Sequence, residues 1–155
     1  MAAPGPEPHL AAGQPPRAAN SPRARLSNTK RVRLAGEILA SYVQVRWVLR
    51  RAPIAAVVDG LRSQSAPTRS GEGTLAEARH LGHIVTRILV LLPGDTRCLA
   101  RSLVLTRLLA RRGIPAKLVI AARRGPDFLA HAWVEHDGIP VLNPGDGSYA
   151  RLVEL

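Results

Sequence analysis

The sequence predicts an α+β fold in which several helices precede a small antiparallel sheet. Apolar residues recur at helical spacing between Thr29 and Leu92, which is typical of amphipathic helices. After Pro115, branched apolar residues occur in short runs that turn residues separate, which is typical of strands. A length of 155 residues suits one modest domain. We therefore expect one domain over residues 29–155.

Composition limits the kinds of protein that this chain can be. Hydrophobic residues make up 46% of it, but only five residues are aromatic, so the core must consist of Leu, Val, Ile and Ala. A single cysteine excludes an internal disulfide and fits a reducing compartment. No apolar run is long enough to cross a membrane, and no signal peptide is recognisable at the start. We expect a cytoplasmic protein that has no membrane contact.

The first 92 residues divide into a tail and a helical region. Residues 1–28 are rich in Pro, Ala, Gly and Arg without a period, so we expect a disordered tail. Residues 29–92 are expected to be helical: one helix from Thr29 to about Arg51, and a shorter second helix that begins at Pro53. A capping-box pattern at Thr74 opens the third helix, which Pro93 and Gly94 end. His80 and His83 lie on this third helix, but nothing nearby completes a metal site, so we expect no metal and no cofactor.

Residues 93–155 contain the pattern that carries chemistry. Asp95 or Thr96 can cap a Leu-rich helix, and Gly113 is suited to the position just after its end. Cys98 then lies in the first turn, where free N–H groups and the helix dipole favour a thiolate, and the same N–H groups can support an oxyanion. Strands are expected at 116–121, 128–135 and 140–142, with a last short strand at 149–153. The turn between the second and third strands contains His136, which we expect to be solvated.

Cys98, His131 and Asn143 follow one another in the order of a cysteine nucleophile, its base and the residue that orients the base. If the second and third strands form a hairpin, His131 and Asn143 are neighbours. The alternative is that a lone cysteine in a Leu-rich helix is only a small core residue. The ordered set and the position of Cys98 at a helix start favour catalysis.

Several motifs resemble those of a known family. They are the Cys-Leu-x-Arg-Ser-Leu run at Cys98, the Leu-Leu-x-Arg-Arg-Gly-Ile helix end, and the Ala-His-Ala-Trp-Val-Glu-x-Asp-Gly strand at His131. Together they resemble the transglutaminase-like core, which is related to papain-type proteases, and more narrowly the leader peptidase of lasso-peptide biosynthesis. The resemblance implies a stand-alone cysteine protease that removes the leader from a ribosomally made precursor. It further implies two partners, which are a separate leader-recognition protein and a macrolactam-forming cyclase.

The resemblance also assigns roles to residues. Cys98 is the nucleophile, and its helix-start position supplies backbone support for an oxyanion. His131 is the base, and Asn143 occupies the third position, where this family usually has Asp. Asp146, three residues further on, is the rival third member. Trp133 lies two residues after His131 and either walls the substrate cleft or fills core.

The net charge of +11 comes almost entirely from 20 arginines against 2 lysines. The arginines are scattered and lack interleaved aromatic residues, which argues against nucleic-acid binding.

Two alternatives to the peptidase stay open. One is another acyl-transfer enzyme on the same core, such as a transglutaminase or an amidase, and the other is a non-catalytic Arg-rich binding module.

Overall fold

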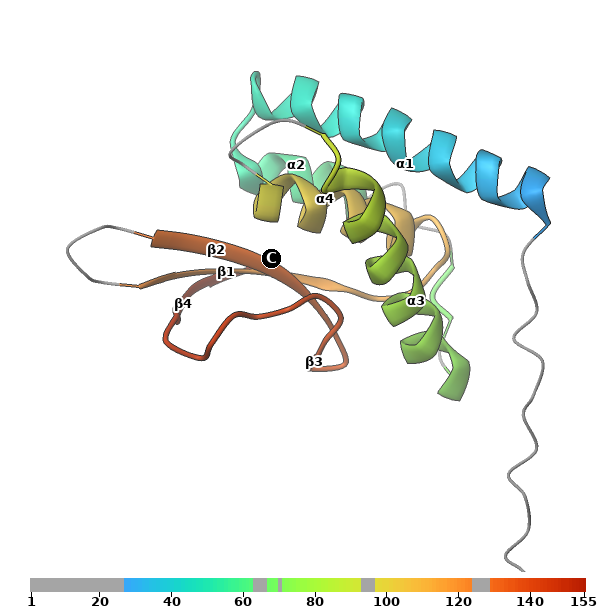
Figure 1. The fold of residues 1–155 in the computed structure, drawn as a ribbon. Helices are drawn as coiled ribbons and strands as arrows, with labels where there is room; N and C mark the ends of the chain where they lie inside the picture. Colours follow the sequence, from blue (N-terminus) through green and yellow to red (C-terminus); the bar gives the residue numbers. More distant parts are fainter. Residues whose placement is uncertain (1–26, 63–66, 70, 93–96, 124–128) are drawn as a thin grey trace, which may run out of the picture.

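The computed structural model describes residues 27–62, 67–69, 71–92, 97–123 and 129–155. In this part of the chain, four helices precede four strands (Figure 1). The elements are α1 (Asn28–Leu49), α2 (Ile54–Arg62), α3 (Glu72–Leu89), α4 (Arg97–Ala110), β1 (Lys117–Arg123), β2 (Leu129–His136), β3 (Ile139–Pro140) and β4 (Ala150–Glu154). The α+β fold class that the sequence predicts is confirmed.

The strands form one antiparallel sheet in the order β3-β2-β1-β4. β1 pairs with β2 along its whole length, and this register places Ala121 opposite His131. β3 is short and pairs only with Glu135 and His136. Among the described residues, the first part of β2 therefore has a strand partner on one side only.

The helices cover one face of the sheet, and α4 lies between α1 and β2 (Figure 1). The main core fills this space with side chains from α1, α2, α3, α4 and the sheet, among them Ile38, Val57, Val85, Leu105 and Val134. A second, smaller cluster on the opposite face consists of Val119, Ala121 and Trp133, with Leu142 and Tyr149 packed against it. Both faces of β1 and β2 are therefore covered at their centre.

Gly113 follows the end of α4, as the sequence predicts. Its φ of +69° is the left-handed conformation that follows many helix ends, and the N–H of Ile114 donates to the carbonyl of Leu109 at 3.0 Å. A Cβ at this position would meet the carbonyl oxygen of Pro67 at 2.1 Å, so a glycine is required. The expected caps at the other end, Asp95 and Thr96, lie outside the described residues, as does the predicted tail up to residue 26.

Two expectations about α3 and its surroundings are wrong. The helix begins at Glu72 with Gly71 as its N-cap, so Thr74 is not the cap of a capping box. The hydroxyl of Thr74 instead lies 2.7 Å from the carbonyl of Gly71 and 3.0 Å from Nε2 of His136. The second wrong expectation is that His136 is solvated. Its side chain is only 3% exposed, because α3 covers it and its Nδ1 donates to the carbonyl of Pro115 at 2.6 Å.

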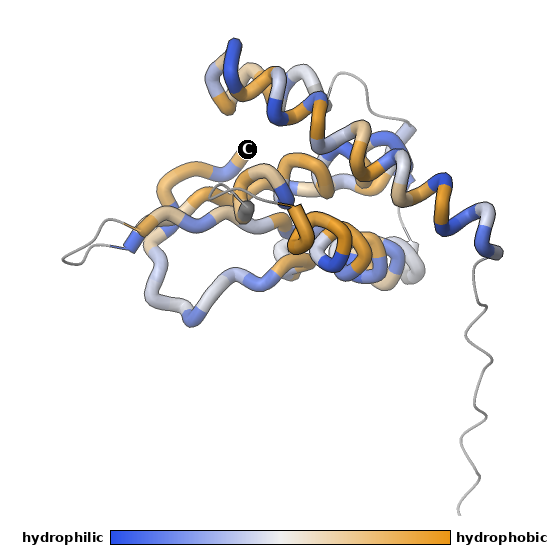
Figure 2. The backbone as a smooth tube through the Cα atoms, turned by 45° about the horizontal axis from the view of Figure 1, so that its top comes forward, coloured by the Kyte–Doolittle hydropathy of each residue, from blue (hydrophilic) through white to orange (hydrophobic). Residues whose placement is uncertain are grey.

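None of the helices in the described part of the chain combines the length and the apolar character that crossing a bilayer requires. Hydrophobic and hydrophilic residues alternate along α1, the longest of them (Figure 2). The helices are instead built for packing on one another and on the sheet.

The hydroxyl of Ser102 ties α4 to β2, and its removal should be measurable. Ser102 is fully buried and donates to the carbonyl of Ala132 at 3.0 Å. We expect Ser102→Ala to lower the free energy of unfolding by about 1–2 kcal/mol, because the buried carbonyl loses its partner. Urea unfolding of the purified chain measures this change.

Thr106, one turn further along α4, provides the matched control. It is 3% exposed, and its hydroxyl has no hydrogen-bond partner among the described residues. Thr106→Val should leave the stability unchanged or raise it, since a buried unpaired hydroxyl is lost. Equal destabilisation by both substitutions would show that the Ser102 bond contributes nothing.

Candidate active site

Cys98 is a free cysteine in the first turn of α4. Its side chain is partly exposed, whereas most of the following residues of the helix are buried. The first-turn N–H groups of a helix have no partner within the helix, and the helix dipole is positive there. These N–H groups can therefore receive a developing oxyanion at this position, while a residue that only fills core would be buried.

One edge of β2 organises the surroundings of this cysteine. Alternate carbonyls of a strand point to the same side, so those of Ala132 and Val134 share one edge. The N–H of Val141 donates to Val134 at 2.8 Å, and the hydroxyl of Ser102 donates to Ala132 at 3.0 Å. The helix that carries Cys98 and the segment that follows β3 therefore flank the same edge of β2.

His131 lies one residue before Ala132 on this edge. Its ring stacks on Trp133 at a centroid distance of 5.9 Å and lies 5.3 Å from the ring of Tyr149. Its Nε2 is 2.9 Å from the backbone carbonyl of Asn143. A carbonyl only accepts hydrogen bonds, so Nε2 carries the proton and Nδ1 is the nitrogen that can act as a base.

The hairpin thus brings Asn143 beside His131, as the sequence predicts. The backbone carbonyl of Asn143 makes the contact, and its side chain does not. The side-chain Oδ1 of Asn143 accepts instead from the N–H of Gly145 at 2.9 Å and closes a tight turn. Gly145 has a φ of +90°, and a Cβ there would lie 2.9 Å from the ring of Tyr149. The turn therefore holds both the carbonyl of Asn143 and the ring of Tyr149 against His131.

Asp146, the rival third member, is engaged elsewhere. Its carboxylate accepts from the backbone N–H of Ser148 at 3.0 Å and from the hydroxyl of the same residue, and it pairs with Arg123 at 3.5 Å. The hydrogen bonds from Ser148, with a smaller contribution from Arg123, hold the pKa of Asp146 below its ordinary value. Because the pKa falls on folding, this carboxylate stabilises the fold above its unfolded pKa, and the effect is lost as the pH falls through the folded pKa.

The face of the sheet on which each residue lies sets how the thiol and the imidazole can meet. Side chains alternate along β2, so Ala132 and Val134 point toward the helices, while His131 and Trp133 point to the other face. Cys98 precedes Ser102 by one helical turn, a rise of about 6 Å. Among the described residues, no hydrogen bond joins Sγ of Cys98 to the ring of His131. In the part of the chain that the structure describes, no strand covers the edge of β2 at this point, so a contact between the two groups would have to form around that edge.

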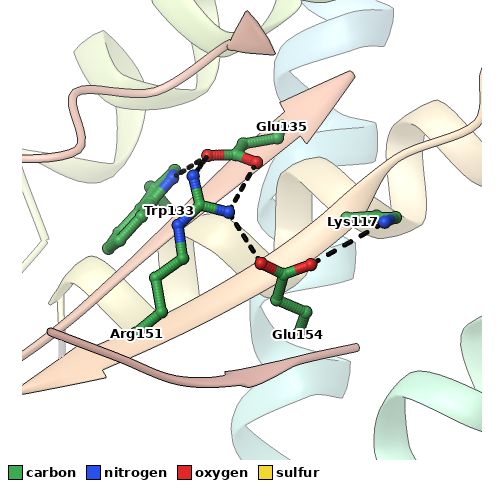
Figure 3. A network of polar contacts seen from close by, with 5 residues as sticks. All are labelled: Lys117, Trp133, Glu135, Arg151 and Glu154. Carbon is green, nitrogen blue, oxygen red and sulfur yellow. Dashed lines mark hydrogen bonds and ion pairs between the residues drawn. The ribbon is translucent and has the colours of Figure 1, made fainter. Parts of the chain in front are cut away.

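The indole of Trp133, on which the ring of His131 stacks, is fixed by a buried carboxylate. Figure 3 shows this carboxylate, Glu135, with its partners. The side chain of Glu135 is 4% exposed and accepts from Nε1 of Trp133 at 2.8 Å. Arg151 of β4 donates two hydrogen bonds to the same carboxylate, of 2.8 and 3.2 Å. It also donates to Glu154 at 2.7 Å, and Glu154 forms an ion pair with Lys117. A buried carboxylate needs such partners, because its desolvation is costly.

Trp133 is 3% exposed, which favours the alternative that it fills core over the alternative that it walls a cleft. The sequence reasoning missed the residues that hold it and His131, namely Ser102, Glu135, Gly145, Tyr149 and Arg151. Among these residues, only Glu135 could have been identified from the sequence. An acidic side chain on a buried strand needs a hydrogen-bond or ion-pair partner. The partners come from distant elements that no local pattern identifies.

The described residues contain no group of three or more His, Cys, Asp and Glu side chains that could hold a metal ion. His80 and His83, which share α3, are both exposed.

A comparison with protein families gives one match. The family model described as the transglutaminase-like superfamily matches residues 39–154, which is about three quarters of the chain. No curated protein and no solved structure matches the chain. The matched range contains Cys98, His131, Asn143 and Asp146.

The tautomer of His131 is directly testable. We expect neutral His131 to carry its proton on Nε2, because that nitrogen donates to the carbonyl of Asn143. Imidazole ¹⁵N chemical shifts and long-range ¹⁵N–¹H couplings, measured above the titration range of the ring, identify the protonated nitrogen. A proton on Nδ1 would mean that the bond to Asn143 does not form in solution.

Proposed function

This chain belongs to the transglutaminase-like superfamily, and we propose on that premise that it is a cysteine peptidase that removes the leader from a lasso-peptide precursor. Membership in this superfamily indicates an activity of the cysteine-protease or acyl-transfer type. The proposal narrows that activity to one substrate class and to water as the acyl acceptor.

One observation carries the catalytic part of the proposal. A partly exposed free cysteine lies in the first turn of α4, which the Ser102 bond ties to the open edge of β2, and His131 on β2 has an available Nδ1. The base of an acyl-transfer enzyme must take a proton from the thiol, and under this proposal the two groups meet at that edge. A core cysteine in a binding module would need neither exposure nor a base.

The acylation half of the proposed reaction uses Cys98 and His131. Nδ1 of His131 takes the thiol proton as Sγ of Cys98 attacks the scissile carbonyl, and the first-turn N–H groups of α4 receive the oxyanion. The C–N bond then breaks, and the imidazolium gives its proton to the leaving amine. The product is a thioester on Cys98, and the bond from Nε2 to the carbonyl of Asn143 keeps the ring oriented throughout.

Deacylation returns the enzyme to its starting state. His131 takes a proton from water, and the oxygen attacks the thioester carbonyl. The C–S bond breaks, the thiolate of Cys98 regains the proton, and the carboxylic acid leaves. An amine in place of water would give an amide, which is the outcome for the transglutaminase alternative, whereas an amidase releases a carboxylic acid as a peptidase does.

The motifs around Cys98 and His131 support the narrower assignment to lasso-peptide biosynthesis, since they resemble the leader peptidase of that pathway. Under this proposal a separate recognition protein holds the leader, so that cleavage becomes effectively intramolecular. A cyclase then closes the freed core peptide into a macrolactam. The proposed setting is the cytoplasm, where a ribosomally made precursor is formed.

The proposed activity requires Cys98 and His131. We expect Cys98→Ala to abolish leader removal, and His131→Ala to lower its rate by about 10²–10⁴-fold, because the thiol loses its base. The assay incubates the purified chain with a lasso-peptide precursor, with and without a leader-recognition protein, and follows cleavage by mass spectrometry. In the presence of an added primary amine, the mass of the product separates a peptidase, which forms the carboxylic acid, from a transferase, which forms the amide.

His80→Ala is the matched control, because His80 is an exposed histidine on α3 outside this site. It should retain the full rate. Cleavage by a folded Cys98→Ala protein would end the catalytic proposal, and a rate that the recognition protein leaves unchanged would end the split-enzyme proposal.

The third member of the site acts through its main chain, so its side chain should matter little. Asn143→Ala keeps the carbonyl that bonds His131 but loses the bond to Gly145, and we expect less than a roughly tenfold loss in kcat. Asp146→Ala breaks contacts only to Ser148 and Arg123 and should cost no more than this. Steady-state kinetics of both variants check the assignment, which an inactive Asp146→Ala protein would contradict.

A further inference from the structure

A cavity of about 590 Å³ lies beside the first turn of α4. It is lined by residues from the end of α1, from the α1–α2 turn and from the starts of α2 and α4, which are Arg46, Leu49, Arg50, Ala52, Pro53, Ile54 and Leu99. Leu99 directly follows Cys98, so the cavity adjoins the residue that carries the nucleophile in the proposed reaction. Its volume falls in the range of sites that hold small ligands or ligand side chains.

The cavity combines an apolar floor with a basic rim. Leu49, Ile54 and Leu99 are partly buried and pack against the main core. Arg50 is exposed at the rim, where it makes no ion pair within the described part of the chain. None of the lining residues that the structure describes is acidic, so Arg50 has no carboxylate partner among them.

The wider surroundings strengthen this field. The only acidic residue of α1 is Glu37, which is already paired with Arg111 and Arg112 at the opposite end of α4. The next basic residue along the chain, Arg51, lies over the ring of Trp47 at 3.8 Å. A ligand that enters the cavity therefore meets apolar side chains and the exposed guanidinium of Arg50, which attracts a carboxylate.

We propose that this cavity is a substrate subsite that takes an apolar side chain of the peptide, while Arg50 pairs with a carboxylate on a neighbouring peptide residue. The inference rests on the proposed peptidase function for the identity of the substrate, but the binding that it describes needs no turnover. Contacts at a distance from the scissile bond fix the carbonyl relative to the thiol. The subsite thus selects peptides that are acidic and apolar beside the cleaved bond.

Binding to the full chain carrying Cys98→Ala tests the subsite, because this protein cannot turn over the peptide. The probes are three fluorescein-labelled octapeptides, in which Leu alternates with Glu, Leu alternates with Lys, or Ser alternates with Glu. Fluorescence anisotropy should show the Leu-Glu peptide binding at least about tenfold more tightly than either of the others. Arg50→Glu should weaken the Leu-Glu peptide about tenfold and strengthen the Leu-Lys peptide.

Arg33→Glu is the matched control, since it makes the same charge change on the exposed face of α1 about 25 Å away along the helix. It should leave the affinity of all three peptides within about twofold. Equal weakening by Arg33→Glu and Arg50→Glu would reduce the effect to overall charge and overturn the subsite, as would equal binding of the Ser-Glu and Leu-Glu peptides.

The outcomes separate the subsite from the proposed reaction. Selective binding of the Leu-Glu peptide by a chain that cleaves no precursor would keep the subsite and remove the peptidase. Cleavage of a precursor at the same KM by the wild-type and Arg50→Glu proteins would keep the peptidase and remove the subsite.

Discussion

The open edge of β2 at Ala132 is the constraint on which the rest of this site depends. A carbonyl at the edge of a sheet must find a donor when it is buried, and here the hydroxyl of Ser102 supplies one at 3.0 Å. Had β3 continued along β2, a strand would have taken that carbonyl and α4 could not have approached the edge. The shortness of β3 thus leaves room for the helix that carries Cys98 beside the strand that carries His131.

The same edge explains why the main chain orients His131. After β3 the chain runs back along β2, where the N–H of Val141 bonds Val134. Close packing supports this path, since a Cβ on Gly82 of α3 would lie 3.1 Å from the carbonyl of Val141. Two residues later the carbonyl of Asn143 reaches Nε2. A backbone carbonyl is present whatever the side chain, so the chain can carry Asn where the family usually carries Asp and still fix the ring.

On the face of the sheet away from the helices, hydrogen bonds and an ion pair hold a buried centre in place. Glu135 binds both the indole N–H of Trp133 and the guanidinium of Arg151, and so links β2 to β4 beneath the ring of His131. Removing one partner of such a group leaves the other uncompensated, so these residues are expected to act as a unit. The ring of His131 therefore stacks on an indole that residues of β2 and β4 hold together.

The sequence by itself determined the order of the elements and singled out Cys98 and His131 as the proposed reactive pair. Helical periodicity, the glycine after α4 and the branched apolar runs are local signals, and they depend on the geometry of one element at a time. They placed Cys98 in a first turn and His131 on a strand whose hairpin returns toward Asn143. The start of α3 was missed, because the Thr-x-x-Glu pattern at Thr74 is a local signal that packing against His136 overrides.

Only the tertiary structure decided which atoms meet. That His131 bonds a carbonyl rather than an amide or a carboxylate depends on the path of the chain after β3, which no spacing fixes. The engagement of Asp146 with Ser148, the burial of His136 and the grip of Arg151 on Glu135 likewise join residues through folded geometry. Hydrogen bonds are directional and short in range, so their partners are settled only when distant segments have packed to within about 3 Å.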